Sequence, residues 1–347
     1  MDRIDFRSDT VTWPTPAMRE AMMEARIGDD VYGEDPTVNE LETIAADLVG
    51  KEAGLFVASG TMGNLTGILA QATRGEQVLL GNDAHCFRSE AGSLSALGGV
   101  VTRTLQTDFM GRMGVEDLEH AISPDDPHYP RSRLIAVENS YGAKQGRPIP
   151  TDYFAEIRVC ADRHDLSIHL DGARLFNSAV ALGVEASEIT RYVDSVSFCL
   201  SKGLCAPAGS VVCGSTAFIK EARRIRKALG GGMRQAGILA AAGIVALEEM
   251  IDRLAEDHEN ARRLAMGLAA IPEIELNPED IQTNIIFFEL SDDVPWTAAD
   301  IARKLRDDGQ VLIGVKGERG FRAVTHFWVG SNEVEELLGQ LRLALAG

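Results

Sequence analysis

The sequence lacks the features that mark membrane, secreted and nucleic-acid-binding proteins. It contains no run of about 18 apolar residues, so we expect no membrane span. Its first residues, MDRIDFRSDTVTWP, have no apolar core of the kind a signal peptide needs. Lys and Arg number 34 against 52 Asp and Glu, and the net charge of -18 repels nucleic acid and anionic membranes. We therefore expect a cytoplasmic protein that has neither nucleic-acid nor membrane partners.

Disulfide and metal-binding patterns are also missing. None of the five cysteines forms a C-x-x-C pair, and reduced, mostly buried thiols are the expectation. The seven histidines show no H-x₃-H spacing and no cluster with cysteine. The sequence therefore predicts no metal site, and any anionic ligand must be held by locally placed cations and amides.

What the sequence does contain, from about residue 36 to residue 212, is an alternation of apolar runs with helical patterns. Short β-branched runs typical of buried parallel strands occur at 78–81, 133–139, 166–172, 195–202 and 209–214. Apolar residues spaced three or four apart predict helices between them, at 37–50, 61–72 and 151–165. This alternation predicts an α/β domain with a central, mostly parallel sheet.

A chain of 347 residues suits two domains. A long helix from about Arg234 to His258 is expected to lead into a C-terminal domain. That domain shows an apolar run at 284–290, a helix near 298–308, two further apolar runs and a final helix. We expect a large ligand-binding domain with an N-terminal arm at 1–254 and a small α+β domain at 255–347.

Two side chains follow neighbouring apolar runs of the predicted sheet. Asp171, in HLDGAR, comes directly after one run, and Lys202, in SKGL, ends another. Ligands of open parallel sheets bind at the carboxyl ends of the strands, and a lysine rarely ends a buried strand without a function. Burial would make its amine nucleophilic towards a carbonyl. The alternatives are a helix N-cap for Asp171 and an exposed turn for Lys202.

Two further segments suit an anion. ASGTMGN predicts a helix that starts near Gly60, where free amides and the helix dipole attract phosphate. Arg234 follows three glycines near another predicted helix start, a place that disfavours a cation unless it serves an anion. A plain capped helix and a solvated basic patch are the respective alternatives.

Two more residues are candidates because of their surroundings. His85 follows the 78–81 run, and its ring could stack on an aromatic cofactor. Arg322 lies inside an apolar C-terminal run and could bind a substrate carboxylate through two hydrogen bonds. A structural histidine and an edge-strand arginine remain the alternatives.

Taken together, these segments resemble the L-threonine aldolase family of pyridoxal-5′-phosphate (PLP) enzymes, which have PLP-dependent transferase fold type I. The matching stretches keep the family's order and span almost the whole chain: FRSDTVT, DDVYGEDPTVNELE, ASGTMGN, AHCFRSEAG, HLDGARLFN, SKGLCAPAGS, LGGGMRQAGILAAAG and RAVTH. The resemblance implies retro-aldol cleavage of L-3-hydroxy-α-amino acids to glycine and an aldehyde. It also implies a homotetramer built from close dimers.

The resemblance assigns a role to each matching residue. Lys202 matches the lysine that holds PLP covalently, and Asp171 and Arg174 match the residues at the pyridine nitrogen and the phenolic oxygen. His85 matches the histidine that stacks on the ring. The other matches are Gly60, Thr61 and a neighbouring subunit's Arg234 at the phosphate, Ser8, Arg174 and Arg322 at the substrate carboxylate, and Tyr32 reaching the partner's site.

One position departs from the family pattern. The family reads E-N-T-H where this chain reads Glu138-Asn139-Ser140-Tyr141, and the missing histidine lies near the substrate's β-hydroxyl. His85 and Tyr141 are therefore both candidates for the catalytic base, and the pocket for the β-substituent is expected to differ from that of the family. A PLP transferase of the transaldolase or hydroxymethyltransferase type, a β-eliminating lyase and a non-catalytic PLP-binding protein remain as alternatives.

Overall fold

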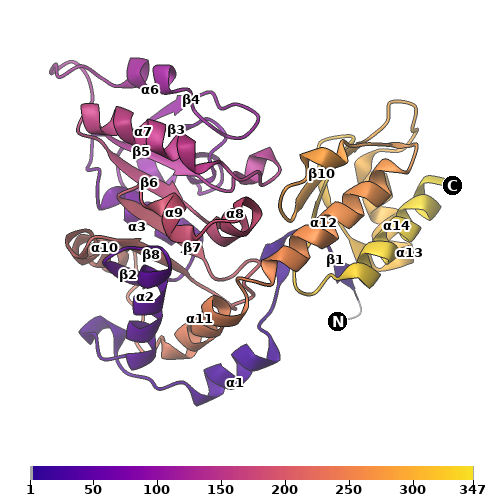
Figure 1. Ribbon diagram of the computed structural model, residues 1–347, viewed down its shortest axis with the longest axis horizontal. Helices are drawn as coiled ribbons and strands as arrows, with labels where there is room; N and C mark the ends of the chain where they lie inside the picture. The colour runs from indigo at the N-terminus through magenta and orange to yellow at the C-terminus, as the bar shows by residue number, and fades with distance from the viewer. Residues whose placement is uncertain (1–2, 347) are drawn as a thin grey trace. The chain divides into compact units, whose positions relative to one another are not determined.

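The computed structural model describes residues 3–346, which form two compact units (Figure 1). The larger unit runs from Pro14 to Ile251. The smaller unit combines the N-terminal residues up to Trp13 with the residues from Asp252 onward. The division into domains at residues 1–254 and 255–347, which we expect from the sequence, stays a prediction.

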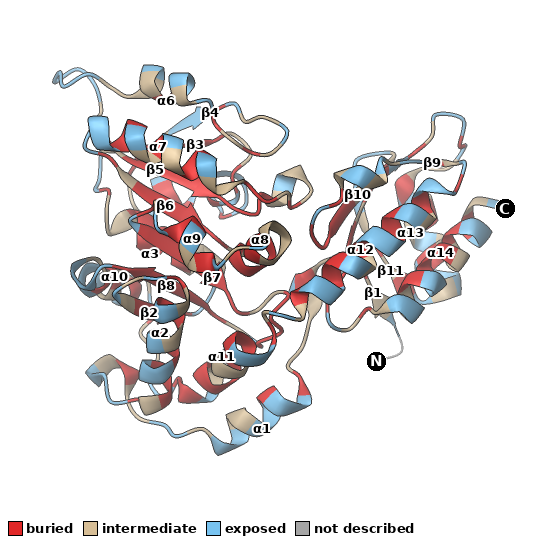
Figure 2. Cartoon of the chain, viewed as in Figure 1, coloured by how far each residue is buried: buried red, intermediate tan, exposed pale blue. Residues whose placement is uncertain are grey.

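The larger unit is built on a seven-stranded sheet with the order β2-β8-β7-β6-β5-β3-β4. Its strands are β2 (Ala53–Val57), β3 (Gln77–Gly81), β4 (Val101–Leu105), β5 (Ser132–Glu138), β6 (Ser167–Asp171), β7 (Ser195–Cys199) and β8 (Ser210–Gly214). Every residue of β3, β7 and β8 is buried, as expected for strands covered on both faces (Figure 2). The predicted α/β class is confirmed.

The five runs predicted as strands are β3, β5, β6, β7 and β8, but one of them has the wrong direction. β8 is antiparallel to both of its neighbours, β7 and β2, whereas the other pairs of the sheet are parallel. Only residues 200–209 separate β7 from β8, and parallel neighbours need a crossover of about a dozen residues or more. The prediction of a parallel strand at 209–214 was therefore wrong. The apolar runs did not predict β2 or the mostly exposed β4.

Helices connect these strands, and side-chain caps stand at the start of some of them. The helices of the larger unit are α1 (Pro16–Glu24), α2 (Pro36–Leu48), α3 (Gly60–Leu69), α4 (His85–Arg88), α5 (Ser93–Ala96), α6 (Val115–Ala121), α7 (Thr151–Arg163), α8 (Leu175–Leu182), α9 (Ala186–Thr190), α10 (Thr216–Ala228) and α11 (Gly237–Glu249). Short 3₁₀ turns lie at η2 (Asp30–Tyr32) and η3 (Gly142–Lys144). Asp35 caps α2 and Ser59 caps α3, each by accepting backbone N–H groups of the first turn. The predictions of α2, α3 and α7 are confirmed.

The single long helix predicted from Arg234 to His258 was wrong. The chain forms α11 and then a separate helix, α12 (Leu254–Ala269), with residues 250–253 between them. The interruption coincides with the boundary between the units at Ile251. Glu256 and Asp257 lie in the first turn of α12, where acidic side chains favour a new helix start.

The smaller unit contains an antiparallel four-stranded sheet with the order β12-β13-β10-β9. Its remaining elements are β1 (Ile4–Asp5), η1 (Asp9–Val11), β9 (Ile274–Glu275), η4 (Pro278–Asp280), β10 (Ile285–Leu290), α13 (Ala298–Gly309), β11 (Val311–Leu312), β12 (Gly314–Lys316), β13 (Gly320–Val324) and α14 (Ser331–Ala346). Phe288 of β10 and Phe321 of β13 stack in its core, with ring centroids 4.9 Å apart.

The N-terminal residues are part of this smaller unit. β1 pairs in parallel with β11, and the Trp13 ring stacks on Trp328 with centroids 4.3 Å apart. The Trp328 indole N–H also donates to the Trp13 carbonyl oxygen at 3.0 Å. Because of these contacts, Ser8 is carried by the same unit as Arg322.

Two expectations from composition can be compared with the structure. All five cysteines are buried and unpaired, which confirms the prediction of buried thiols. Between residues 3 and 346, no helix combines the length and the apolar character that a membrane crossing requires.

Candidate active site

The predicted acid and lysine follow adjacent parallel strands of the larger unit. Asp171 is the last residue of β6, and Lys202 lies in the turn after β7. In the register of this strand pair Asp171 faces Ser197, so both strands end at the same edge of the sheet. Asp171 is 3% exposed, and its Oδ1 accepts the Ala173 N–H at 3.1 Å.

A buried amide on α3 holds the other oxygen of Asp171. Asn64 Nδ2 donates to Asp171 Oδ2 at 2.7 Å and to Glu90 Oε1 at 2.8 Å. Asn64 Oδ1 in turn accepts the Ser197 hydroxyl at 2.8 Å. One amide therefore connects β6, β7 and the segment after α4, and its two N–H bonds hold two carboxylates in place.

Glu90 also contacts the predicted stacking histidine. His85 Nδ1 lies 2.8 Å from Glu90 Oε1, and the histidine side chain is 46% exposed while that of Glu90 is fully buried. The hydrogen bond to Glu90 raises the pKa of His85, and Asp171 acts in the same direction. Partial burial and the charge of Lys202 oppose them. The structure therefore favours a protonated or strongly hydrogen-bonded imidazole at this position.

A second buried carboxylate holds the backbone beneath His85. Glu138 Oε2 accepts the His85 backbone N–H at 2.9 Å, and Oε1 accepts the Gly142 N–H at 2.8 Å. Burial, and then repulsion from Asp171, raises the pKa of Glu138 to about 7. A side-chain carbon built on Gly142 would lie 3.6 Å from an Arg174 guanidinium nitrogen, so Arg174 borders the same loop.

The start of α3 provides free backbone donors near this edge of the sheet. Ser59 accepts the amides of Met62 through its hydroxyl and of Gly63 through its carbonyl. Within residues 3–346, the amides of Gly60 and Thr61 make no hydrogen bond. Two unsatisfied N–H groups at the start of a ten-residue helix are suited to an anion.

Tyr141, the other candidate base, is buried. Its exposed fraction is 2%, and its ring packs against Gly111, where a side-chain carbon would lie 2.3 Å from Tyr141 Cδ2. Its hydroxyl lies beside Gly81 and Thr107 without completing a hydrogen bond to a described residue. Burial raises the pKa of Tyr141 well above its ordinary value. As placed, this phenol is a poor proton acceptor.

The residues predicted to reach a neighbouring subunit lie together on the surface. The Arg234 side chain is 54% exposed, and its Nη1 pairs with Asp29 at 2.9 Å. The Asp30 N–H donates to the Arg234 carbonyl at 3.0 Å, and Tyr32 of the same 3₁₀ turn is 75% exposed. The structure thus brings Arg234 and Tyr32 to one surface of the larger unit.

The predicted carboxylate binders Ser8 and Arg322 lie in the smaller unit. Arg322 Nη1 donates to the carbonyl oxygen of Arg7, the residue before Ser8, at 3.0 Å. Ser8 caps η1 by accepting the Thr10 N–H. The smaller unit therefore places the arginine beside the N-terminal segment that carries the serine.

Sequence reasoning assigned no role in the site to Asn64, Glu90 or Glu138. Each lies in a stretch quoted for the family resemblance or next to a predicted strand end. Their polarity within otherwise apolar or small-residue segments was the available signal, because buried polar side chains need partners. Which partners they find depends on the crossing of β5, β6 and α3, which periodicity does not reveal.

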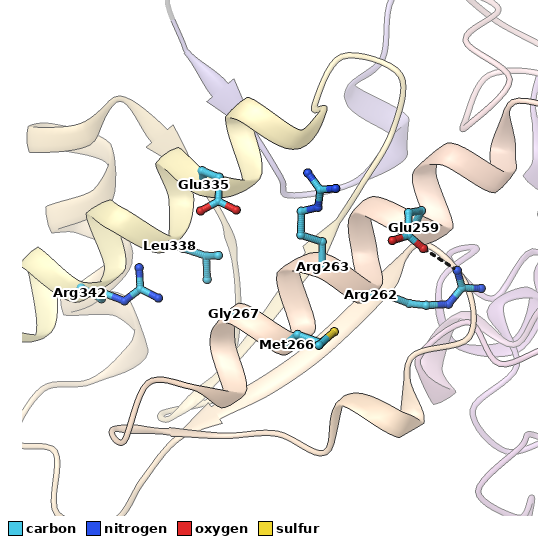
Figure 3. A pocket seen from close by; sticks show the side chains of 8 residues that line it. All are labelled: Glu259, Arg262, Arg263, Met266, Gly267, Glu335, Leu338 and Arg342. Carbon is cyan, nitrogen blue, oxygen red and sulfur yellow. Dashed lines mark hydrogen bonds and ion pairs between the residues drawn. The ribbon is translucent and has the colours of Figure 1, made fainter.

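Two other features of the molecule have some of the properties of a binding site. His85, Glu90 and Asp171 have potential metal-ligand atoms within 4.8 Å of one another, but Asn64 and the Ala173 N–H already hold the two acids. In the smaller unit, a groove of about 480 Å³ lies between α12 and α14 (Figure 3). Its lining residues are Glu259, Arg262, Arg263, Met266, Gly267, Glu335, Leu338 and Arg342. This groove has no buried acid, histidine or lysine.

Comparisons with known proteins identify the family of the chain. A family model described as beta-eliminating lyase matches residues 5–291. The chain is 45% identical over 338 residues to the probable low-specificity L-threonine aldolase 2 of Arabidopsis thaliana, covering 96% of this chain and 95% of that protein. It is 41% identical over 343 residues to the low specificity L-threonine aldolase of Escherichia coli strain K12, covering 99% of each. A solved threonine aldolase structure from Leishmania major matches with a TM-score of 0.82 at 20% identity, covering 98% of this chain and 99% of that one, a similarity of fold.

Proposed function

The chain belongs to the beta-eliminating lyase family and, within it, to the low-specificity L-threonine aldolases, and from this premise we propose that it is a PLP-dependent aldehyde-lyase. Its reaction is the retro-aldol cleavage of L-3-hydroxy-α-amino acids, L-threonine and L-allo-threonine among them, to glycine and an aldehyde. The observation that carries this proposal is the buried Asp171 carboxylate at the strand edge that also carries Lys202, held in place by Asn64.

The residues at this edge fit the cofactor. Lys202 would hold it as a Schiff base, and Asp171 would pair with its pyridine nitrogen. The Gly60 and Thr61 amides, which bind no described residue, would meet its phosphate. When bound, PLP supplies an electron sink for the electron pair released as the Cα–Cβ bond breaks.

The chain's own groups manage the protons of this reaction. The Asp171 carboxylate would keep the pyridine nitrogen of the cofactor protonated, and Asn64 fixes the direction in which that carboxylate points. A proton must leave the β-hydroxyl and a proton must reach Cα. We assign proton transfer to His85, whose half-exposed imidazole contrasts with the buried Tyr141. Tyr141 then acts on the β-substituent pocket through the packing of its ring.

The remaining roles concern substrate and assembly. Ser8, Arg174 and Arg322 bind the substrate carboxylate. We propose that Arg234 and Tyr32 reach the neighbouring subunit's site in a homotetramer built from close dimers. Both side chains are more than half exposed on one surface of the larger unit, as a contact with a second copy requires. We place the enzyme in the cytoplasm because its five cysteines are buried and unpaired, as suits a reducing compartment.

Product analysis tests this function. Purified holoenzyme is incubated with L-threonine, L-allo-threonine, phenylserine and serine, and glycine, aldehyde, ammonia and 2-oxo acid are measured together. We expect glycine and aldehyde in equal amounts, and a Lys202→Arg variant that produces neither. Ammonia and 2-oxo acid in equal amounts would instead identify a β-eliminating lyase. Product that forms only when a second aldehyde or a folate is added would identify a transferase.

A further inference from the structure

Glu90 is a buried charged group of the larger unit. Its side chain is completely buried, and burial raises its pKa. Oε1 has two partners, Asn64 Nδ2 at 2.8 Å and His85 Nδ1 at 2.8 Å, whereas Oε2 has none among the described residues. A buried carboxylate with one unsatisfied oxygen destabilises the fold. Its presence therefore needs an explanation beyond packing.

The contacts of Glu90 point to an effect on His85. A carboxylate on Nδ1 stabilises the N–H at that nitrogen and fixes the plane of the ring. Nε2 is then the nitrogen that remains to exchange a proton. The exposed pair of His128 with Asp126, at 2.7 Å, has the same chemistry but lies in solvent on both sides, so solvent screens it. Glu90 acts on His85 from a buried position, where the interaction is stronger.

Asn64 connects this pair to the acid of the cofactor site. Its two amide hydrogens donate to Asp171 and to Glu90. The Asn64 amide therefore fixes the orientations of both carboxylates at once. Four charged groups act on or border His85 from the elements packed around it, namely Glu90, Asp171 on β6, Glu138 on β5 and Lys202 after β7. Of these, only Glu90 bonds directly to the imidazole ring.

We propose that Glu90 is a positioning residue of the active site: it holds the His85 ring by Nδ1 and presents Nε2 for proton transfer, and Asn64 couples it to Asp171. This inference rests on the proposed function, because it assigns Glu90 to the same reaction. Among residues 3–346, Glu90 makes one further hydrogen bond besides those to Asn64 and His85: its backbone carbonyl accepts the Ser93 N–H, a contact that needs no charged side chain.

The first test does not depend on turnover. Exchange of the imidazole C2 hydrogen with deuterium is measured for each histidine by mass spectrometry across pH, in the holoenzyme and in the cofactor-free chain. In the wild type, the exchange midpoint of His85 should lie above the ordinary value of about 6.5. Glu90→Gln should lower the midpoint to that value or below it, and Glu90→Asp, which keeps the charge, should lower it less. The exchange curve of His128 is the internal reference and should be unchanged.

The second test separates an effect through His85 from a general loss of structure. Glu90→Gln is combined with His85→Asn in a double-mutant cycle, and kcat/KM for L-threonine and cofactor content are measured for all four proteins. Carboxylates that orient metal-binding histidines contribute a factor of about 10 to 100, and we expect a loss in this range for Glu90→Gln. In the His85→Asn background, Glu90→Gln should cause little further loss.

The outcomes distinguish this inference from the proposed function. An unchanged His85 midpoint in Glu90→Gln, equal midpoints in the Gln and Asp variants, or equal losses in both backgrounds of the cycle would each overturn the role of Glu90. A wild-type enzyme that produces no glycine, with a His85 midpoint that depends on Glu90, would overturn the function and leave the positioning of His85 in place.

Discussion

Substitution of Gly111 by alanine tests the buried placement of Tyr141. Gly111 has a φ of +93°, and a side-chain carbon there would lie 2.3 Å from Tyr141 Cδ2 and 2.4 Å from Cγ. Carbon atoms pack at about 3.5–4.0 Å, so the ring would have to move by more than about 1 Å. The ring is buried and bordered by Gly81 and Thr107, which leaves it little room to do so.

Two contributions to the loss of stability can be separated by a control. An L residue in a left-handed conformation costs about 1–2 kcal/mol, and overpacking a filled site costs about 1–3 kcal/mol. Gly111→Ala should therefore destabilise the protein by about 2–5 kcal/mol. Gly75 has a φ of +83° with no atom within 4 Å of the added carbon. Gly75→Ala should cost only the conformational part, about 1–2 kcal/mol.

Thermal unfolding of the two variants provides the measurement. For units of 150–250 residues, 1 kcal/mol corresponds to about 2–4 °C in Tm, so Gly111→Ala should unfold several degrees below Gly75→Ala. In a Tyr141→Ala background, the additional loss caused by Gly111→Ala should disappear. Equal Tm values for Gly111→Ala and Gly75→Ala would show that the Tyr141 ring does not occupy this position.

Three further predictions follow from individual side chains. Arg234→Ala should weaken PLP retention, measured as the rate at which cofactor is lost on dialysis, and an unchanged rate would contradict a role at the neighbouring phosphate. Tyr141→His should change the ratio of kcat/KM for phenylserine to kcat/KM for threonine. An aromatic contact of about 0.5–1.5 kcal/mol corresponds to a fewfold to about tenfold change in this ratio. An unchanged ratio would mean that Tyr141 does not select the substituent. Burial lowers the pKa of His169 to about 4, so the unfolded chain binds that proton more readily. The free energy of unfolding that His169 contributes is complete above pH 6.5 and is lost as the pH falls towards 4, by at most about 3 kcal/mol. His169→Asn should therefore flatten the plot of unfolding free energy against pH in this range. An unaltered plot would exclude His169 as the cause.

The sheet could be predicted from the sequence because its central strands are continuous apolar runs. Asp171 was placed correctly at a strand end for the same reason, because it lies at the end of the apolar run and is the last residue of β6. The direction of β8 was not predictable from apolar periodicity, which is the same in parallel and antiparallel strands. The short link at 200–209 contained the missing information.

The candidate site was predictable in its residue types but not in its contacts. Asn64 lies on the buried side of α3, and its partners Asp171 and Glu90 lie 107 and 26 residues away. Such contacts depend on how the helices and strands pack against one another, and the pattern of a single sequence does not reveal this packing. The burial of Tyr141 depends likewise on Gly81 and Gly111, two small residues whose proximity becomes visible only in the fold.

Identification of the lysine that holds the cofactor tests the central claim most directly. The holoenzyme is reduced with borohydride, digested and mapped by mass spectrometry for the pyridoxyl label. The account predicts that the label lies on Lys202, in the turn after β7, and that Asp171→Asn reduces activity without moving the label. A label on Lys51, Lys144 or any other lysine would contradict the assignment of this strand edge as the active site.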